Sequence, residues 1–257
     1  MKIENHILVG AQFKQTPNIS GLKIVGPRFL ILHYTASGNV PGTVDSLTRK
    51  GGNKSAHLVI GRAGEVVQLA SFDQRAWHCG QSEWKGLESL NGYSIGIEFV
   101  NWGDLTEDKD GVFRSWAGTI VPAHEVVNAI HKNETIPRDW QDFTPAQLAK
   151  GAEVARAILE AYPSIEMILG HDDIAPTRKT DPGPAFPMNQ FLIDCGFMDA
   201  PEPDPGYTEY MARAMHFEHI DGEIYVTLSD SEGGITEHID DDEARGLRDW
   251  LTKILPE

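Results

Sequence analysis

The stretch FLILHYTA at residues 29–36 decides the class of fold. It is a short apolar run that ends in polar residues, which is typical of a buried strand that emerges at the edge of a sheet. SAHLVI at residues 55–60 and SIGIEFV at residues 94–100 have the same character. The first of these two runs continues into GRAGEVVQLA at residues 61–70, and this pair predicts a hairpin.

A helix is predicted over residues 144–162. Thr144 can cap its start, Pro145 suits the first helical position, and Gln147 can reach back to the cap. Pro163 ends the helix, and the run EMIL that follows predicts another strand. Strands that alternate with helices predict an α/β fold with a mixed central β-sheet flanked by helices.

Residues 102–143 show no single clear periodicity. The DG pair at residues 110–111 predicts a turn, and residues 123–132 predict one short helix within an insertion. Farther along, residues 212–229 carry a strong hairpin signal, and residues 241–255 place apolar residues at helical spacing behind an Asp cap. We therefore expect a small C-terminal α+β module.

The chain has 257 residues and a formal net charge of −16, and the negative charge is concentrated near its C-terminal end. Residues 201–257 contain 15 acidic against 4 basic residues. Because this change in charge follows the Pro-rich seam DAPEPDPGY, we predict a catalytic domain at residues 1–198, a linker at 199–207 and an acidic module at 208–257. We expect no nucleic-acid partner, since nucleic acids favour basic surfaces, and no membrane insertion, since no apolar run is long enough.

The N-terminal residues and the cysteines bear on the cellular compartment. The N-terminus lacks the pattern of a Sec signal, so we expect a cytoplasmic chain. Cys79 and Cys195 are too few for a disulfide framework, and buried free thiols are the simplest interpretation.

Glu98 is the first candidate for chemistry. In SIGIEFV, Ile95, Ile97 and Phe99 fall on one face of the predicted strand, and Glu98 lies on the other face beside two small residues. A carboxylate on an inner strand needs a cleft to face. The alternative, a glutamate on an edge strand in water, stays open.

Two histidines follow predicted strands. His33 lies near the C-terminal end of its strand, where α/β folds usually place sites, although a lone histidine there is more often a hydrogen-bonded core residue. His171 opens the loop GHDDIAPTRKTDPGPAF, whose prolines bar helix formation and hold side chains at low entropic cost. With Asp181 from this loop, two histidines and one carboxylate form a favoured ligand set for catalytic zinc. Spacing alone leaves this ligand set open, because the sequence has no local HExxH-type motif.

Sequence blocks that run in order over residues 25–195 carry a family resemblance. The blocks are HYTA, SAHLVIGRAGEVVQL, RAWHCGQSEWKG, LNGYSIGIEFVN and GHDDIAPTRKTDPGPAF. They resemble the zinc-dependent N-acetylmuramoyl-L-alanine amidases of the AmpD and phage-lysozyme type, whose fold is shared by peptidoglycan recognition proteins. The resemblance implies a zinc hydrolase that cleaves the amide bond between N-acetylmuramic acid and L-alanine in peptidoglycan.

Two biological settings fit such an enzyme. One is an endolysin that acts on the cell wall after release, and the other is an enzyme that trims muropeptides during wall recycling. The longer chain favours the first. The alternative from another class is a non-catalytic peptidoglycan-binding module, but such proteins typically lose a metal ligand.

The resemblance also implies roles for individual residues. His33, His171 and Asp181 correspond to the zinc ligands. Glu98 is similar to the carboxylate that activates the catalytic water, and Lys179 to the cation near the developing oxyanion. Without the resemblance, Lys179 would be interpreted as a solvated surface lysine. The predicted substrate contacts are Trp77, His78 and Asn101, although buried structural tryptophan is the more frequent role for Trp77.

Several further residues are expected to support the structure. His57 is predicted to be packed and hydrogen-bonded, and Asp172 and Asp173 to support the loop through backbone hydrogen bonds. His124 and His131 are predicted to lie on the surface. The insertion is longer than a minimal amidase needs, and the acidic module, which matches no wall-binding repeat, is expected to meet an intramolecular or a protein partner.

Overall fold

The computed structural model describes residues 1–24, 26–199, 215–220, 223–228 and 235–239. The chain divides into two compact units, Met1–Asp199 and Ala200–Glu257. The first unit contains a six-stranded mixed sheet whose strands lie in the order β17-β5-β11-β6-β7-β3. Their bounds, in that order, are Met167–Gly170, Phe29–Tyr34, Ser94–Phe99, Leu58–Ile60, Val66–Gln68 and Gln12–Phe13.

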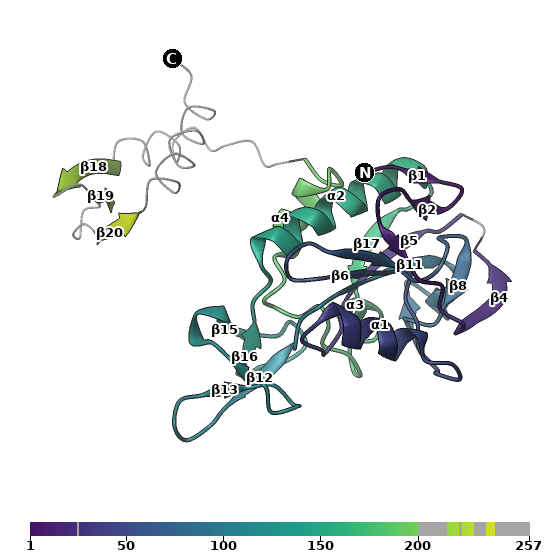
Figure 1. Ribbon diagram of the computed structural model, residues 1–257, viewed down its shortest axis with the longest axis horizontal. Helices are drawn as coiled ribbons and strands as arrows, with labels where there is room; N and C mark the ends of the chain where they lie inside the picture. Colours follow the sequence, from purple (N-terminus) through teal and green to yellow (C-terminus); the bar gives the residue numbers. More distant parts are fainter. Residues whose placement is uncertain (25, 200–214, 221–222, 229–234, 240–257) are drawn as a thin grey trace, which may run out of the picture. The chain divides into compact units, whose positions relative to one another are not determined.

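The predicted α/β fold is confirmed. Strand β5 pairs in parallel with both β17 and β11, and β6 and β7 form the predicted antiparallel hairpin. Helices α2 (Pro145–Ala161) and α4 (Met188–Asp194) lie together on one side of this sheet, and α1 (Val40–Thr48) lies on the other (Figure 1). As predicted, Thr144 caps α2, because its Oγ1 accepts the Gln147 N–H at 3.2 Å.

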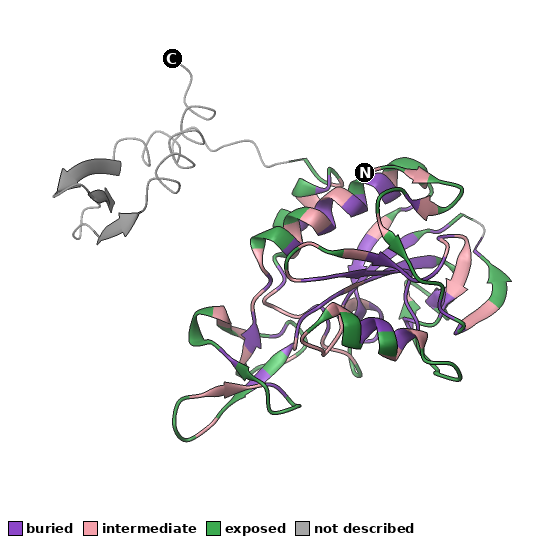
Figure 2. Cartoon of the chain, in the orientation of Figure 1, coloured by how far each residue is buried: buried purple, intermediate pink, exposed green. Residues whose placement is uncertain are grey.

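The two faces of the central sheet differ in chemistry. Ile95, Ile97 and Phe99 of β11 pack with Leu30 and Leu32 of β5 against the apolar side of α2. Figure 2 shows these strands buried along most of their length. The opposite face of the same two strands carries His33 and Glu98, which are paired in register. The alternation of the sequence therefore places a histidine and a carboxylate side by side, away from the main core.

The segment between β11 and α2 forms a second sheet, which we call the inserted sheet. It has five antiparallel strands in the order β14-β13-β12-β16-β15 and projects from the central sheet (Figure 1). In chain order, the bounds of β12 to β16 are Asp104–Glu107, Phe113–Arg114, Ile120–Val121, Val126–Ile130 and Pro137–Gln141.

The short helix predicted at residues 123–132 is wrong. Only the single 3₁₀ turn η2 (Ala123–Glu125) forms there, and every residue of β15 pairs with a residue of β16. The backbone groups of this segment are therefore satisfied by a strand farther along the chain, which outweighs a weak local helix preference. The turn predicted at residues 110–111 is present, with the Gly111 N–H donating to the Asp108 carbonyl at 3.0 Å.

Short elements complete the first unit. Helix α3 (His171–Ile174) directly follows β17, and the 3₁₀ turn η1 (Leu90–Gly92) precedes β11. Three two-stranded pairs lie around the central sheet: β1 (Ile3–Glu4) with β2 (Ile7–Leu8), β4 (Ile19–Lys23) with β8 (Gln74–Ala76), and β9 (Glu83–Trp84) with β10 (Leu87–Glu88).

The second unit contains a three-stranded antiparallel sheet of β18 (Met215–Ile220), β19 (Glu223–Leu228) and β20 (Ile235–Ile239). Strands β18 and β19 form the predicted hairpin. The helix predicted at residues 241–255, and all but the first residue of the predicted linker, lie outside the described residues. Within the described part of the chain, no helix has both the length and the apolar character needed to cross a bilayer.

Candidate metal centre and cavity

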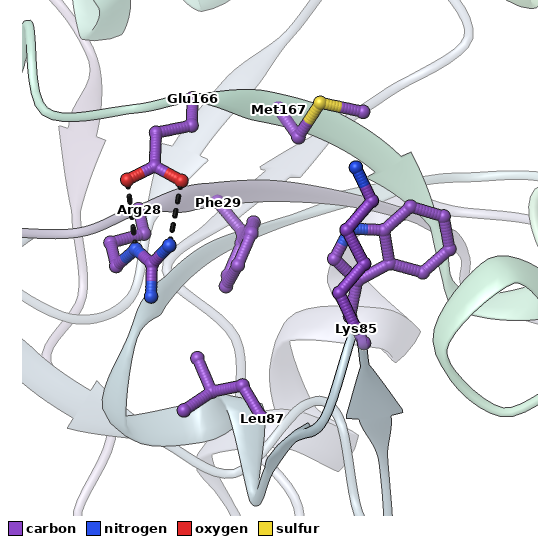
Figure 3. Close-up of a pocket in the computed structure, with 7 residues that line it drawn as sticks. Arg28, Phe29, Lys85, Leu87, Glu166 and Met167 are labelled. Carbon is purple, nitrogen blue, oxygen red and sulfur yellow. Dashed lines mark hydrogen bonds and ion pairs between the residues drawn. The ribbon is translucent and has the colours of Figure 1, made fainter.

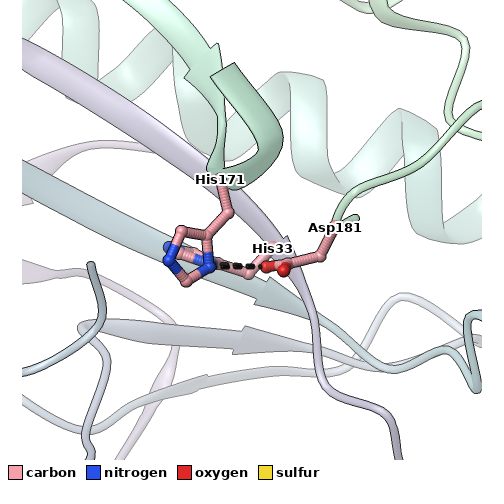
Figure 4. A group of neighbouring side chains, drawn as sticks. All are labelled: His33, His171 and Asp181. Carbon is pink, nitrogen blue, oxygen red and sulfur yellow. Dashed lines mark hydrogen bonds and ion pairs between the residues drawn. The ribbon is translucent and has the colours of Figure 1, made fainter. Parts of the chain in front are cut away.

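Three buried side chains from different elements converge on one point. His33 comes from the C-terminal end of β5, His171 from the first residue of α3, and Asp181 from the loop after α3. The two Nδ1 atoms lie 3.0 Å apart, and each lies 2.9 Å from Asp181 Oδ2 (Figure 4). The structure thus brings together the three predicted metal ligands, which form a possible metal site.

The hydrogen bonds around this group favour a cation at its centre. His171 Nε2 lies 2.9 Å from the Cys79 carbonyl, which only accepts, so this nitrogen carries a proton and Nδ1 is the nitrogen left to bind an ion. Burial and the neighbouring His171 ring lower the pKa of His33 to about 4, so His33 is neutral at pH 7. Burial opposes ionisation of Asp181, but the adjoining imidazole rings of His171 and His33 outweigh it and lower the pKa of this carboxyl.

The spacing of the three atoms tests the fit of a metal ion. A tetrahedral ion with bonds of 2.0–2.1 Å to nitrogen and oxygen separates its ligand atoms by about 3.3 Å. The observed separations of 2.9–3.0 Å are close to that value. If His33 Nε2 carries its proton toward His78 Nδ1, at 3.1 Å, all three converging atoms present electron pairs to one another. A divalent ion satisfies such an arrangement, whereas the protein alone leaves it repulsive.

Glu98 lies on the wall of the same cavity. Burial raises the pKa of Glu98 to about 8, and the negative charge of Asp181 adds to the rise. Among the described residues, the carboxyl group of Glu98 has no hydrogen-bond partner, so both of its oxygens are available to a bound molecule. A carboxyl group whose pKa is close to the working pH can both take up and release a proton.

The cavity has a volume of about 630 Å³ and contains most of the predicted site residues. Besides the possible metal site and Glu98, the predicted residues on its wall are Lys179, Trp77 and His78. Lys54, Arg178 and Trp116 are among the lining residues that the sequence did not predict. Lys54 and Trp116 lie in segments without a motif, so no local signal could have identified them.

Asn101 does not line this cavity, which corrects the substrate contact predicted for it. Its side chain is fully buried. The amide donates to the carbonyls of Gln141 and Asp142 at 3.1 and 2.7 Å, and its oxygen accepts the Gly103 N–H at 2.7 Å. Asn101 therefore joins the end of β11 to the inserted sheet, and its polar atoms are already occupied.

His131 is buried, which corrects the surface position predicted for it. It lies just after β15, and its Nε2 is 3.0 Å from Asp172 Oδ2. The neighbouring Lys132 Nζ lies 2.8 Å from Asp172 Oδ1 and 2.6 Å from Asp173 Oδ1. The inserted sheet thus holds the two aspartates that follow the candidate ligand His171.

The predicted backbone support by these aspartates is also observed. The Asp172 N–H donates to the Asp181 carbonyl at 2.8 Å, and Asp173 Oδ2 accepts the Gly170 N–H at 2.7 Å. His57 is packed and hydrogen-bonded as predicted, with the Gly96 N–H donating to its Nδ1 at 3.0 Å.

A second, smaller cavity of about 140 Å³ lies at the opposite end of β5 (Figure 3). Its rim is formed by Arg28 and Glu166, whose bidentate ion pair has distances of 2.9 and 2.8 Å. Phe29, Leu87 and Met167 supply apolar walls. Arg28 and Glu166 neutralise each other and Lys85 is the remaining charged side chain, so this cavity offers no counterpart to the two histidines and the carboxylate around His33.

Comparisons with known proteins agree with this geometry. Residues 23–184 match the family described as N-acetylmuramoyl-L-alanine amidase. The 1,6-anhydro-N-acetylmuramyl-L-alanine amidase AmpD of Escherichia coli is 39% identical over 140 residues, which are 54% of this chain and 57% of AmpD. The chain spans about half the length of the curated relatives that it matches.

Solved structures give the same relationship. The crystal structure of a selenomethionine derivative of AmpD is 28% identical with a TM-score of 0.56, covering 76% of this chain and 99% of that one. AmiD from Escherichia coli, solved with anhydro-N-acetylmuramic acid-L-Ala-D-γ-Glu-L-Lys, is 28% identical with a TM-score of 0.51 and coverages of 77% and 67%. AmpDh3 from Pseudomonas aeruginosa, solved with an anhydromuramic pentapeptide, is 27% identical with a TM-score of 0.51 and coverages of 94% and 78%.

Proposed function

Because this chain belongs to the N-acetylmuramoyl-L-alanine amidase family, we propose that it hydrolyses the amide bond between N-acetylmuramic acid and L-alanine in peptidoglycan or its muropeptides. The observation that carries the proposal is the convergence of His33, His171 and Asp181 in a cavity that also contains Glu98. A site of this kind combines a possible metal centre with a carboxyl group that can move protons.

Zinc is the ion that we propose for the site. Two neutral imidazoles and one carboxylate are its usual catalytic donor set, and the bond from His171 Nε2 to the Cys79 carbonyl is the type of outer contact that orients a zinc ligand. When bound, zinc would supply Lewis acidity toward the scissile carbonyl and would lower the pKa of water.

The side chains of the cavity would perform the proton transfers. Glu98 would accept a proton from the attacking water and then deliver it to the amine of L-alanine as the C–N bond breaks. Lys179 lines the same cavity, and its ammonium group would stabilise the negative charge that develops on the carbonyl oxygen. His78 is buried beside His33 at 3.1 Å and would hold the orientation of that ring.

The substrate class is supported by the ligands of two structural relatives. AmiD was solved with an anhydro-N-acetylmuramic acid peptide and AmpDh3 with an anhydromuramic pentapeptide. Both the wall polymer and soluble muropeptides contain the bond in question, so an endolysin and a recycling enzyme are the two settings of this proposal. The cytoplasmic location expected from the sequence stays a prediction.

Mass spectrometry of digests tests the proposal directly. Intact sacculi and soluble anhydro-muropeptides are incubated in parallel with the zinc-loaded full chain, with the Glu98→Gln variant as control. Release of stem peptides that begin with L-alanine is expected with the wild type only. Binding of the chain to sacculi without any released peptide would instead identify a peptidoglycan-binding module.

A further inference from the structure

Trp116 is a large apolar side chain that is exposed to solvent at the wall of the cavity. It lies in the turn between β13 and β14 of the inserted sheet and leaves 75% of its surface exposed. It lines the same cavity as His33, Glu98 and Asp181. Exposing a large apolar side chain to water is unfavourable, and a bound ligand that covers it relieves this cost. Exposed apolar surface beside a site is therefore typical of a ligand contact.

The indole of Trp116 is fixed in orientation despite its exposure. Its Nε1–H donates to the Ala36 carbonyl at 2.9 Å, in the loop that follows His33. Its ring also meets Trp102 edge to face, with centroids 6.4 Å apart and an interplanar angle of 74°. A ring that is already oriented loses little conformational entropy when a ligand packs on it.

Trp102 is itself held closely to the loop after β5. Its backbone N–H donates to Gln141 Oε1 at 2.9 Å. A Cβ atom at Gly38 would lie 2.6 Å from the Trp102 ring, so a residue with a side chain there would displace this ring. The two tryptophans are therefore placed by contacts between the inserted sheet and the loop that follows β5.

The free surface of Trp116 suits one kind of ligand. Because its only donor is already bonded to Ala36, the indole offers an apolar face and no free hydrogen-bonding group. The carboxylates of a stem peptide are better matched by Lys54 and Arg178 on the same cavity wall. The apolar C–H face of a pyranose ring matches a flat indole instead.

We propose that Trp116 is a carbohydrate-stacking residue that recognises the N-acetylglucosamine linked to the muramic acid of the substrate. The inference rests on the proposed amidase function and names a subsite for it. It gives the inserted sheet a role in choosing substrates that carry more than one sugar.

The test compares two synthetic substrates that differ by one sugar, N-acetylmuramoyl-tripeptide and N-acetylglucosaminyl-N-acetylmuramoyl-tripeptide. The measured quantity is the ratio of their kcat/KM values for the zinc-loaded full chain. Trp116→Ala is expected to lower the preference for the disaccharide by about 5–10-fold, mainly through KM, as expected for the loss of one aromatic contact. Trp116→Phe, which keeps a flat face, is expected to restore the ratio to within about threefold.

A matched control comes from the bend that precedes β16 of the inserted sheet. Ile136 leaves 71% of its surface exposed and is outside the cavity lining, so Ile136→Ala is expected to leave the ratio unchanged. Equal losses on both substrates in Trp116→Ala would show a structural role and overturn the proposal. An unchanged ratio, or a Trp116→Phe variant as deficient as Trp116→Ala, would overturn it as well.

Binding measurements separate this inference from the proposed function. Calorimetric titration of the zinc-loaded Glu98→Gln chain with the disaccharide peptide is repeated with Trp116→Ala added, and about 5–10-fold weaker binding is expected. If the wild type cleaves neither substrate but this binding difference persists, the amidase function fails and the sugar contact stands. If cleavage occurs and the binding difference is absent, only the sugar contact fails.

Discussion

The strands of the central six-stranded sheet are buried along most of their length, whereas those of the inserted five-stranded sheet are largely exposed or half-buried (Figure 2). The central sheet supplies His33 and Glu98 from adjacent strands in register. The inserted sheet contacts the site through His131, Lys132 and Trp116. The comparison teaches that His33 and Glu98 lie on the buried sheet, while support of the metal loop and the approach of substrate depend on the more exposed sheet.

The largest expected effect is on the central sheet. Replacing Glu98 by Gln removes the proton acceptor while keeping the size and polarity of the side chain, so kcat for amide hydrolysis should fall by about 10²–10⁴-fold. Zinc content, measured by atomic emission on the purified variant, should equal that of the wild type, because Glu98 is not among the converging ligands. Normal turnover of the Glu98→Gln variant would show that another residue is the general base.

The next effect tests whether the inserted sheet folds together with the central one. Trp140 of β16 is 1% exposed, stacks with His131 at 5.9 Å and packs near Gly183, just past Asp181. Trp140→Ala should lower the free energy of unfolding by about 3–5 kcal/mol, similar to Leu32→Ala in the central sheet. Urea titration followed by circular dichroism should show one transition for each variant. An early, separate transition in Trp140→Ala alone would instead make the inserted sheet an independent unit.

Most of the central sheet could be predicted from the sequence, because strands that are buried on both faces consist of short, nearly continuous apolar runs. The alternation of Ile95, Ile97 and Phe99 was enough to place Glu98 on the opposite face, toward the cavity. The inserted sheet had no such signal. Its strands are short and partly exposed, and the pairing of β15 with β16 depends on residues that a local pattern does not connect.

The site could be predicted in part for the same reason. The candidate ligands follow apolar strands or lie in a proline-rich loop, and the family resemblance grouped them. His131 and Trp116 were not found, because their partners Asp172 and Ala36 lie 41 and 80 residues away in the sequence. The local sequence around Asn101 also does not reveal that its amide bonds to the inserted sheet.

A smaller effect concerns acid stability of the core. Burial lowers the pKa of His57 to about 4, below the 6.5 of an unfolded chain. The unfolded state therefore binds a proton that the native state does not, and stability present above pH 6.5 is lost as the pH falls toward 4, by on the order of 3 kcal/mol for this residue.

The slope of the free energy of unfolding against pH isolates the contribution of His57. The metal-free His57→Gln chain should lose less stability than metal-free wild type between pH 6.5 and 4, with a slope lower by up to one proton. Urea titrations at several pH values give both slopes, and the comparison does not depend on the absolute stability of the variant. Identical slopes would mean that His57 takes up a proton without unfolding.

The smallest effect tests the support that the inserted sheet gives to the metal loop. His131→Leu leaves Asp172 Oδ2 without its 3.0 Å partner and should loosen the loop between His171 and Asp181. Zinc affinity, measured by competition with a chromophoric chelator, should fall by about tenfold, the lower end for contacts around metal ligands. His124→Leu changes an exposed histidine of the same segment and should have no effect. Equal affinities in both variants would confine the role of His131 to packing.

The candidate ligands His33 and His171 are separated by 138 residues of chain. An ion bound by both would link two distant segments of the chain and close the long loop between them. The unfolded chain closes such a loop only at a large cost in conformational entropy. Chelation and heating should therefore act on the same equilibrium, with the melting temperature rising as zinc is added. Loss of the fold would therefore release the ion, and loss of the ion would lower the stability of the fold that remains.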